Sequence, residues 1–210
     1  MQIEIKPEEE KDYRITENLT REAFWNLHLP GCDEHFLLHN LRKAKEFAEE
    51  LDFVAVADGE IVGNIVYVNT KIINGSIEHP VLTFGPVSVL PEYQGKGIGK
   101  QLINHTIRLA KEMGHKAIVI YGDPDYYKKF GFTASKKYNI TNSENKFPAA
   151  LLVLELFPNA LAGIEGVFDE GEAYKVDLNA LEAFEKGFGK KEKGYSVTQE
   201  RFKETSNKFL

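Results

Sequence analysis

The chain has 210 residues, of which 32 are acidic and 26 basic, so its formal net charge is −6. An acidic surface repels phosphate backbones, which excludes general nucleic-acid binding as the expected function. The single cysteine, Cys32, cannot form an internal disulfide, and the charged N-terminus does not resemble a signal peptide. No apolar run reaches the roughly 18 residues needed to span a bilayer. We therefore expect a cytoplasmic protein with no membrane partner.

The first 50 residues predict a short strand over residues 3–5 and two helices. Asp12 and Asp33 are suited to cap the helices, which are expected to run to about Phe24 and about Glu49. Apolar side chains recur every four residues on one face of the first helix, at Ile15, Leu19 and Ala23. Pro30-Gly31 indicates a loop between the two helices.

The central part of the chain predicts a mixed α/β fold. Strands are expected over residues 53–57, 61–73, 81–90, 117–121 and 151–157, and another begins at Phe132. Asp58-Gly59 and Asn74-Gly75 predict hairpin turns, since these residue types tolerate positive φ. An amphipathic helix over residues 97–113 joins two apolar strands into a βαβ unit. Together these features predict a mixed, mostly antiparallel sheet with a parallel βαβ core, flanked by helices.

The pattern weakens after Pro158, and we expect a domain of residues 1–157 followed by a C-terminal extension of residues 158–210. Helices are predicted over residues 178–188 and 198–208, with Ser196 and Gln199 as a capping box. We expect this extension to be weakly structured or helical and to pack on the main domain.

A glycine-rich turn precedes the helix of the βαβ unit. It reads Gln94-Gly95-Lys96-Gly97-Ile98-Gly99-Lys100. Glycines let a ligand approach the backbone, and the free amides and dipole of a helix N-terminus attract phosphate. The turn lacks the Gly-Lys-Ser/Thr ending of a P-loop and the spacing of a dinucleotide-binding turn. It predicts a pyrophosphate seat with two lysines at its rim, although a purely structural turn is the alternative.

A second motif follows the next parallel strand and reads Tyr121-Gly122-Asp123-Pro124-Asp125-Tyr126-Tyr127-Lys128-Lys129-Phe130-Gly131-Phe132. Proline suits the first turn of a helix, so a short helix is expected from Asp123 to about Phe130. The carboxyl ends of neighbouring strands meet at one edge of such a sheet. A tyrosine is therefore expected beside the phosphate seat.

With both motifs in this order, the stretch from Leu82 to Phe132 resembles the GNAT N-acetyltransferase superfamily. Gln94, Gly97 and Gly99 match its Gln/Arg-x-x-Gly-x-Gly/Ala turn, which holds the coenzyme A pyrophosphate. Tyr127, with the following Gly131 and Phe132, matches its Tyr-x-x-x-Gly-Phe motif. The residues of the second motif resemble those of the bacterial predicted acetyltransferases of the YhbS type, and the resemblance covers roughly residues 3–170.

The resemblance implies acetyl-CoA as the cofactor and acetyl donor, with no metal. It implies that Tyr127 is the general acid and that Val87, Ser88 and Val89 offer backbone groups to the pantetheine arm. One such N–H would stabilise the oxyanion by about 3 kcal/mol. Some relatives carry a glutamate base where this chain has Thr83, so the base is left unassigned, with Glu78, Glu92 and a water chain as alternatives.

The loop between the first two helices borders the acceptor site in GNAT folds, which makes Trp25, Asp33 and Glu34 candidate substrate residues. The carboxylates would hold a cationic acceptor, but Asp33 is also suited to cap a helix, and Trp25 is equally suited to the core. His35 and His39 share a helical face, yet no further ligand motif accompanies them, so no metal site is expected.

The expected reaction is transfer of an acetyl group from acetyl-CoA to a primary amine of a small molecule or a protein. The alternative is a non-catalytic acetyl-CoA-binding sensor or regulatory module, and a longer acyl donor would use the same seat. The resemblance allows a homodimer, although no sequence feature encodes one.

Overall fold

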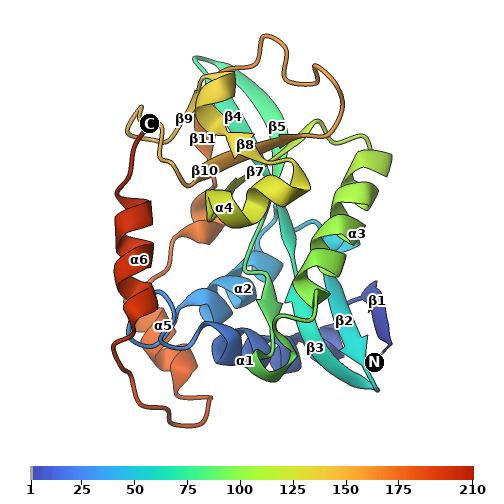
Figure 1. Ribbon diagram of the computed structural model, residues 1–210, viewed down its shortest axis with the longest axis vertical. Helices are drawn as coiled ribbons and strands as arrows, with labels where there is room; N and C mark the ends of the chain where they lie inside the picture. The colour runs from blue at the N-terminus through green and yellow to red at the C-terminus, as the bar shows by residue number, and fades with distance from the viewer. Residues whose placement is uncertain (1) are drawn as a thin grey trace.

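Two twisted sheets organise the protein in a computed structural model that describes residues 2–210 (Figure 1). One has the strand order β1-β2-β3-β6, and the other has the order β8-β10-β7-β5-β4-β11-β9. Most neighbours are antiparallel, whereas β5–β7 and β9–β11 are parallel. This confirms the predicted mixed sheet. The strands are β1 Ile3–Pro7, β2 Phe53–Ala57, β3 Glu60–Ile65, β4 Tyr67–Asn74, β5 Ile77–Phe84, β6 Ser88–Val89, β7 Ala117–Tyr121, β8 Thr133–Ala134, β9 Ile140–Thr141, β10 Leu151–Glu155 and β11 Gly166–Asp169.

Helices flank the sheets, and α3 is the crossover between the parallel strands β5 and β7, as predicted. Its buried side chains, such as Leu102 and Ile103, pack with Leu82 and Ile118 in the main core. No helix within residues 2–210 is long and apolar enough to cross a bilayer. The helices are α1 Tyr13–Phe24, α2 Glu34–Lys43, α3 Ile98–Glu112, α4 Pro124–Tyr127, α5 Leu178–Glu185 and α6 Val197–Ser206.

Two strands that the sequence predicts as continuous are each broken, and both breaks lie at the same level. Residues 61–73 divide into β3 and β4 at Val66, and residues 81–90 divide into β5 and β6 at 85–87. Gly85 donates its backbone N–H to the Val66 carbonyl at 2.9 Å, and a Cβ on Gly85 would lie 2.5 Å from Leu41 Cδ1. Pro86 has no N–H to continue a ladder. The paired strands therefore pass together from one sheet to the other.

Several local predictions are wrong in detail. The second helix ends at Lys43 rather than near Glu49, because Phe47 then bridges to Val68 of β4. Asp12 and Asp33 occupy N-cap positions, but neither side chain accepts a cap hydrogen bond. The second hairpin turn falls at 75–76, one residue later than predicted, since Asn74 still pairs with β5. Ile15 is 50% exposed instead of buried.

The segment after Pro158 contributes both to the sheet and to the helical layer. Its strand β11 pairs with β4, and neither β11 nor β9 was expected from the sequence. Gly194, Ser196 and Gln199 all bond to Asn26, in the loop after α1. The predicted capping box is therefore absent, because the Ser196 hydroxyl and the Gln199 amide donate to the Asn26 carbonyl instead.

Candidate active site

A gap opens in the sheet system where β6 leaves β5. The strand β6 pairs with β3 alone, whereas β5 pairs with β7 only at Leu82 and Ile118. Leu90 donates its backbone N–H to Val62 of β3, so Ser88, two residues earlier, is also a hydrogen-bonded position of this antiparallel ladder. The backbone groups of the intervening residues, Val87 and Val89, consequently point away from β3 and into the gap.

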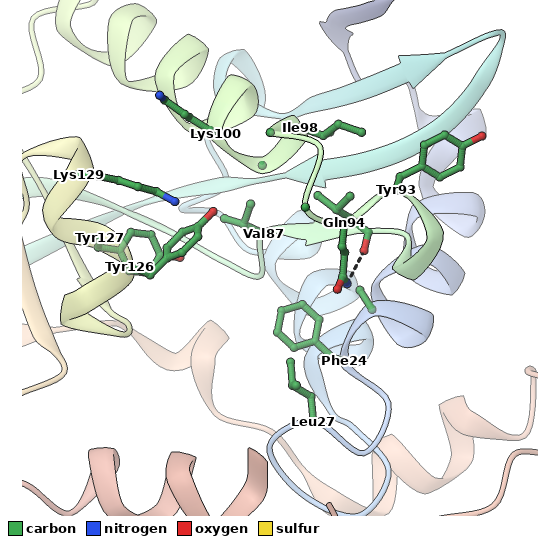
Figure 2. A pocket seen from close by; sticks show the side chains of 15 residues that line it. Phe24, Leu27, Val87, Tyr93, Gln94, Ile98, Lys100, Tyr126, Tyr127 and Lys129 are labelled. Atoms are coloured by element: carbon green, nitrogen blue, oxygen red, sulfur yellow. Dashed lines mark hydrogen bonds between the residues drawn. The ribbon is translucent and has the colours of Figure 1, made fainter. Parts of the chain in front are cut away.

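The glycine-rich turn closes one end of this gap. Gly95 and Gly97 have φ of 73° and 82°, and nothing lies within 4 Å of the position that a Cβ would take on either. Gly97 is the N-cap of α3, and no side chain caps this end of the helix. The Gln94 amide donates to the Val89 carbonyl at 3.0 Å and braces the turn against β6 (Figure 2). The α3 amides and the positive helix end are therefore free to bind an anion.

A cavity of about 460 Å³ lies between this turn, the end of α1 and the α4 segment (Figure 2). The structure brings nine sequence-predicted residues to its wall: Val87, Val89, Gln94, Gly95, Gly97, Ile98, Gly99, Lys100 and Tyr127. Six further lining residues were not predicted: Ala23, Phe24, Leu27, Tyr93, Tyr126 and Lys129. The cavity thus joins an anion-binding helix end to an apolar and aromatic wall.

Tyr127 is held at the cavity by a frame of aromatic rings. Asp123 accepts a hydrogen bond from the Asp125 N–H at 2.8 Å, which caps the short helix α4. The Tyr127 ring then packs on Phe84 and Phe132, with centroids 5.8 and 5.6 Å away. Burial raises the pKa of Tyr127 above its ordinary value, so the phenol stays protonated at neutral pH and is able to donate a proton.

Tyr126 and Lys129 are lining residues that the sequence reasoning missed. The Tyr126 hydroxyl lies 3.4 Å from the position that a Cβ would take on Gly99, at the start of α3. Lys129 lies over the Tyr126 ring, with Nζ 3.6 Å from the centroid. The sequence does contain a signal for these two residues. Tyr126 and Lys129 are three residues apart on one short helical segment, so their side chains are expected on the same face.

Five predicted site residues do not line the cavity. The Ser88 backbone faces β3, and its buried hydroxyl is 2.8 Å from the Thr20 hydroxyl. Lys96 turns toward the Tyr93 ring, with Nζ 4.8 Å from its centroid, whereas Lys100 reaches the wall. The other three are the candidate acceptor residues Trp25, Asp33 and Glu34.

Trp25 and Glu34 have partners outside the cavity. Trp25 donates its indole N–H to the Glu192 carbonyl at 2.9 Å and stacks under Arg21. The Glu34 carboxylate forms a hydrogen bond with the His28 ring, and its oxygen lies 2.8 Å from His28 Nδ1. Burial and the neighbouring Glu34 charge raise the pKa of Asp33 above its ordinary value.

The histidines of α2 contact carboxylates of other helices. His35 Nε2 lies 2.8 Å from Glu185 of α5, and His39 Nδ1 lies 2.7 Å from Glu17 of α1. Within residues 2–210, no group of three His, Cys, Asp or Glu side chains is arranged to hold a metal ion.

Comparison with known proteins places these features in a family. The model of the acetyltransferase (GNAT) family matches residues 16–132, more than half of the chain. The uncharacterized N-acetyltransferase YhbS of Escherichia coli K12 is 26% identical over 139 residues, which cover 66% of this chain and 81% of YhbS. The uncharacterized N-acetyltransferase YjhQ of the same strain is 30% identical over 97 residues, covering 46% and 53% of the two chains.

Solved structures share the fold. The crystal structure of E. coli YhbS in complex with CoA has a TM-score of 0.73 at 24% identity, covering 83% of this chain and 92% of that one. A GNAT acetyltransferase of Brucella melitensis in complex with acetyl-CoA has a TM-score of 0.66 at 28% identity, covering 83% and 99%.

Proposed function

Because this chain belongs to the GNAT acetyltransferase family, we propose that it transfers an acetyl group from acetyl-CoA to a primary amine. The observation that carries the proposal is the uncapped N-terminus of α3, set at the end of a cavity whose other wall presents a protonated tyrosine. YhbS and the B. melitensis relative were crystallised with CoA and acetyl-CoA respectively. The acceptor belongs to a small molecule or to a protein.

The cavity residues fit the two ends of the donor. The α3 amides after Gly97, with Lys100 and Lys129 on the wall, would hold the pyrophosphate. The backbone groups of Val87 and Val89 face the gap and would pair with the pantetheine arm. Gln94 does not need to touch the ligand, since its amide holds the turn against β6.

The chemistry needs a proton donor near the sulfur and a hydrogen bond to the carbonyl oxygen. Tyr127 would protonate the departing thiolate, a step that contributes about 10²-fold or more to rate in enzymes that use it. The backbone N–H of Val87 or Val89 would stabilise the charge that develops on the carbonyl oxygen. The acetyl-CoA itself supplies the activated acyl group.

We also propose that residues 1–157 form the acyl-transfer domain and that residues 158–210 form an extension that encloses one side of it. Hydrogen bonds from Gly194, Ser196 and Gln199 to Asn26 support this arrangement, as does the Arg21–Glu185 ion pair. The extension also supplies β11 to the sheet, so it does not have the features of an independent unit.

Calorimetric titration of acetyl-CoA tests the donor seat. A Gly97→Glu variant places a side chain and a negative charge where nothing now lies within 4 Å. Gly163→Glu is the matched control, because Gly163 also has a positive φ of 74° and open space around it, outside the cavity wall. We expect micromolar binding by the wild type and by Gly163→Glu, with at least a 100-fold loss in Gly97→Glu.

Absence of binding by a folded wild-type protein would contradict the proposal. Thiol release from acetyl-CoA in the presence of primary amines then separates an enzyme from a sensor module. A sensor would bind acetyl-CoA and release no thiol with any amine.

A further inference from the structure

Helix α6 begins against the loop that follows α1. Gln199 donates its side-chain amide to the Asn26 carbonyl at 3.0 Å, and the Thr198 hydroxyl donates to the Leu27 carbonyl at 2.7 Å. Leu27 lines the donor cavity, and its backbone N–H is bonded to the carbonyl of Phe24, which lines it too. We call Phe24 and Leu27 the α1 wall. The first turn of α6 therefore holds this wall by its backbone.

The ring of Phe202, farther along α6, supports the same wall. It stacks on the His28 ring, with centroids 4.3 Å apart and planes at 19°. The His28 ring in turn meets the Phe24 ring edge-on, with centroids 5.5 Å apart. Because Phe24 lines the cavity, a row of three rings leads from α6 to the place where the donor is expected.

The same helix also contacts the segment that carries the two tyrosines of the cavity. Arg201, next to Phe202 in sequence, pairs with the Asp123 carboxylate at 3.2 Å. Asp123 caps α4, and its carbonyl accepts the backbone N–H groups of Tyr126 and Tyr127, each at 3.0 Å. We call Tyr126 and Tyr127 the α4 wall, since both line the cavity. Neighbouring residues of α6 therefore reach two different walls of one cavity.

The chain after α6 is fastened close to the α4 wall. Ala149, just before β10, donates its backbone N–H to the Lys208 carbonyl at 2.8 Å. The next residue, Ala150, accepts the Gly122 N–H at 2.9 Å, and Gly122 lies directly against the Tyr127 ring. Helix α6, drawn in red along one side of the molecule in Figure 1, is thus attached at one end to the α1 wall and at the other beside the α4 wall.

Apart from these attachments, α6 is held by few contacts. Gln199 is the single buried residue of the helix. The Arg201–Asp123 pair is exposed on both sides, and such pairs contribute little to stability. A helix of ten residues is marginal in water without tertiary contacts. The helix is therefore suited to detach locally while the core stays folded.

We propose that α6 is a strap that holds the α1 wall and the α4 wall at the spacing that acetyl-CoA needs. Thr198 and Phe202 are positioning residues in this arrangement, because in the described part of the chain the two walls, and not α6, line the cavity. A ligand seated between the walls favours the arrangement in which α6 reaches both of them. The inference rests on the acetyl-CoA seat proposed above.

Coupling of this kind is reciprocal. The factor by which docked α6 strengthens acetyl-CoA binding equals the factor by which bound acetyl-CoA stabilises the docked helix. The proposal therefore makes two linked statements, one about affinity and one about the local opening of α6, and separate measurements check them.

Calorimetric titration of acetyl-CoA tests the hydrogen bond to the α1 wall. Thr198→Val keeps the branched shape of the side chain and removes the hydroxyl that bonds to the Leu27 carbonyl. We expect its dissociation constant to be about fivefold higher than that of the wild type. Thr205→Val is the matched control in the same helix, because the Thr205 hydroxyl bonds to the Arg201 carbonyl within α6. It should bind acetyl-CoA as the wild type does.

A second pair of variants tests the ring stack. Phe202→Ala removes the ring that packs on His28, and acetyl-CoA binding should again weaken about fivefold. Val197→Ala is the control, since Val197 is 77% exposed on the same helix. Thiol release with benzylamine should show a higher KM for acetyl-CoA in Phe202→Ala with kcat unchanged, because the reacting groups stay in place.

Mass-detected hydrogen exchange follows the strap itself. In the wild type, saturating acetyl-CoA should slow exchange in residues 197–206 about fivefold, the same factor as the loss of affinity in Thr198→Val. In that variant without ligand, these residues should exchange faster than in the wild type. Equal slowing in α5, residues 178–185, would indicate a general tightening of the fold and would overturn the strap.

Each remaining outcome bears on one proposal or on both. A wild type that binds acetyl-CoA no more tightly than Thr198→Val and Phe202→Ala do overturns the strap and leaves the donor seat intact. Exchange of α6 that acetyl-CoA does not change also overturns it. A folded wild type that does not bind acetyl-CoA contradicts the donor seat and, with it, the strap. Equal losses of affinity in the two control variants would remove the specific role of Thr198 and Phe202.

Discussion

Gly122 and Tyr127 are packed so closely that only glycine fits beside the ring. A Cβ on Gly122 would lie 2.3 Å from Tyr127 Cε2 and 2.5 Å from its Cδ2. The backbone of Gly122 does not have positive φ, so steric contact alone demands the missing side chain. The glycine that follows β7 therefore determines where the phenol of the proposed acid lies.

Replacement of Gly122 by alanine should displace the Tyr127 ring and lower turnover at least tenfold. Binding of acetyl-CoA should fall much less, because the α3 end of the cavity is untouched. Gly189→Ala is the control, since Gly189 has neither positive φ nor an atom within 4 Å of its Cβ position. Kinetics and calorimetry on both variants check this, and an unchanged kcat in Gly122→Ala would contradict it.

Tyr127→Phe removes the phenol oxygen and keeps the packing of the ring on Phe84 and Phe132. We expect kcat to fall about 100-fold, with the dissociation constant for acetyl-CoA within twofold of wild type. Steady-state kinetics and calorimetry give the two values. Tyr138→Phe, outside the cavity, should behave as wild type. Equal rates for wild type and Tyr127→Phe would rule out the acid role.

The extension is secured to α1 by a charge pair. Glu185 of α5 binds the Arg21 guanidinium, which is only 2% exposed, and also contacts His35. Removing one partner of a buried pair leaves the other unpaired, at a typical cost of about 3 kcal/mol.

Glu185→Ala should therefore lower the free energy of unfolding by about 3 kcal/mol and speed hydrogen exchange in residues 178–188. Glu182→Ala, an exposed position on the same helix, should change neither. Urea unfolding and mass-detected exchange provide the measurements. Identical exchange in both variants would mean that apolar packing, and not this pair, holds the extension.

A second buried charge cluster makes the stability depend on pH. Asp52 lies near Arg42 and Asn64, and burial, followed by interaction with Glu8, raises the pKa of Asp52 far above its ordinary value. The folded protein therefore binds a proton that the unfolded chain releases above about pH 4. Stability from this group is greatest at low pH and declines as the pH rises toward the raised pKa of Asp52.

In the Asp52→Asn variant this side chain cannot ionise, so the part of the pH dependence of stability that comes from Asp52 should disappear. Between pH 5 and pH 8, the free energy of unfolding of the variant should rise relative to that of the wild type with each pH unit. Urea unfolding at several pH values measures it. Asp58→Asn is the control, because Asp58 is exposed in a turn where asparagine tolerates its φ of 50°. Parallel curves for wild type and Asp52→Asn would contradict the raised pKa.

Local sequence signals predicted the elements that carry the donor site. The apolar face of residues 97–113, the glycines before it and the Asp123-Pro124 start of α4 all act over a few residues. Helix α3 and strand β7 accordingly lie where they were expected, apart from a residue at the helix ends. The order of these elements along the chain was enough to predict the family and the fold class.

Errors arose where a contact distant in sequence overrides the local pattern. The apolar run of residues 81–90 reads as one strand, but Gly85 binds the Val66 carbonyl and the strand divides there. Ser88 looks equivalent to Val87 and Val89 in sequence, yet the register with β3 turns its backbone away from the cavity.

The sequence by itself determined the anion-binding turn, the tyrosine beside it and the βαβ order, because each depends on backbone preferences of neighbouring residues. Only the tertiary structure decided which side chains share a wall with them. Lys129 and Phe24 both line the donor cavity, because the packing of helices on the sheets brings segments far apart in the sequence to one wall. Such packing leaves no periodic trace in the chain.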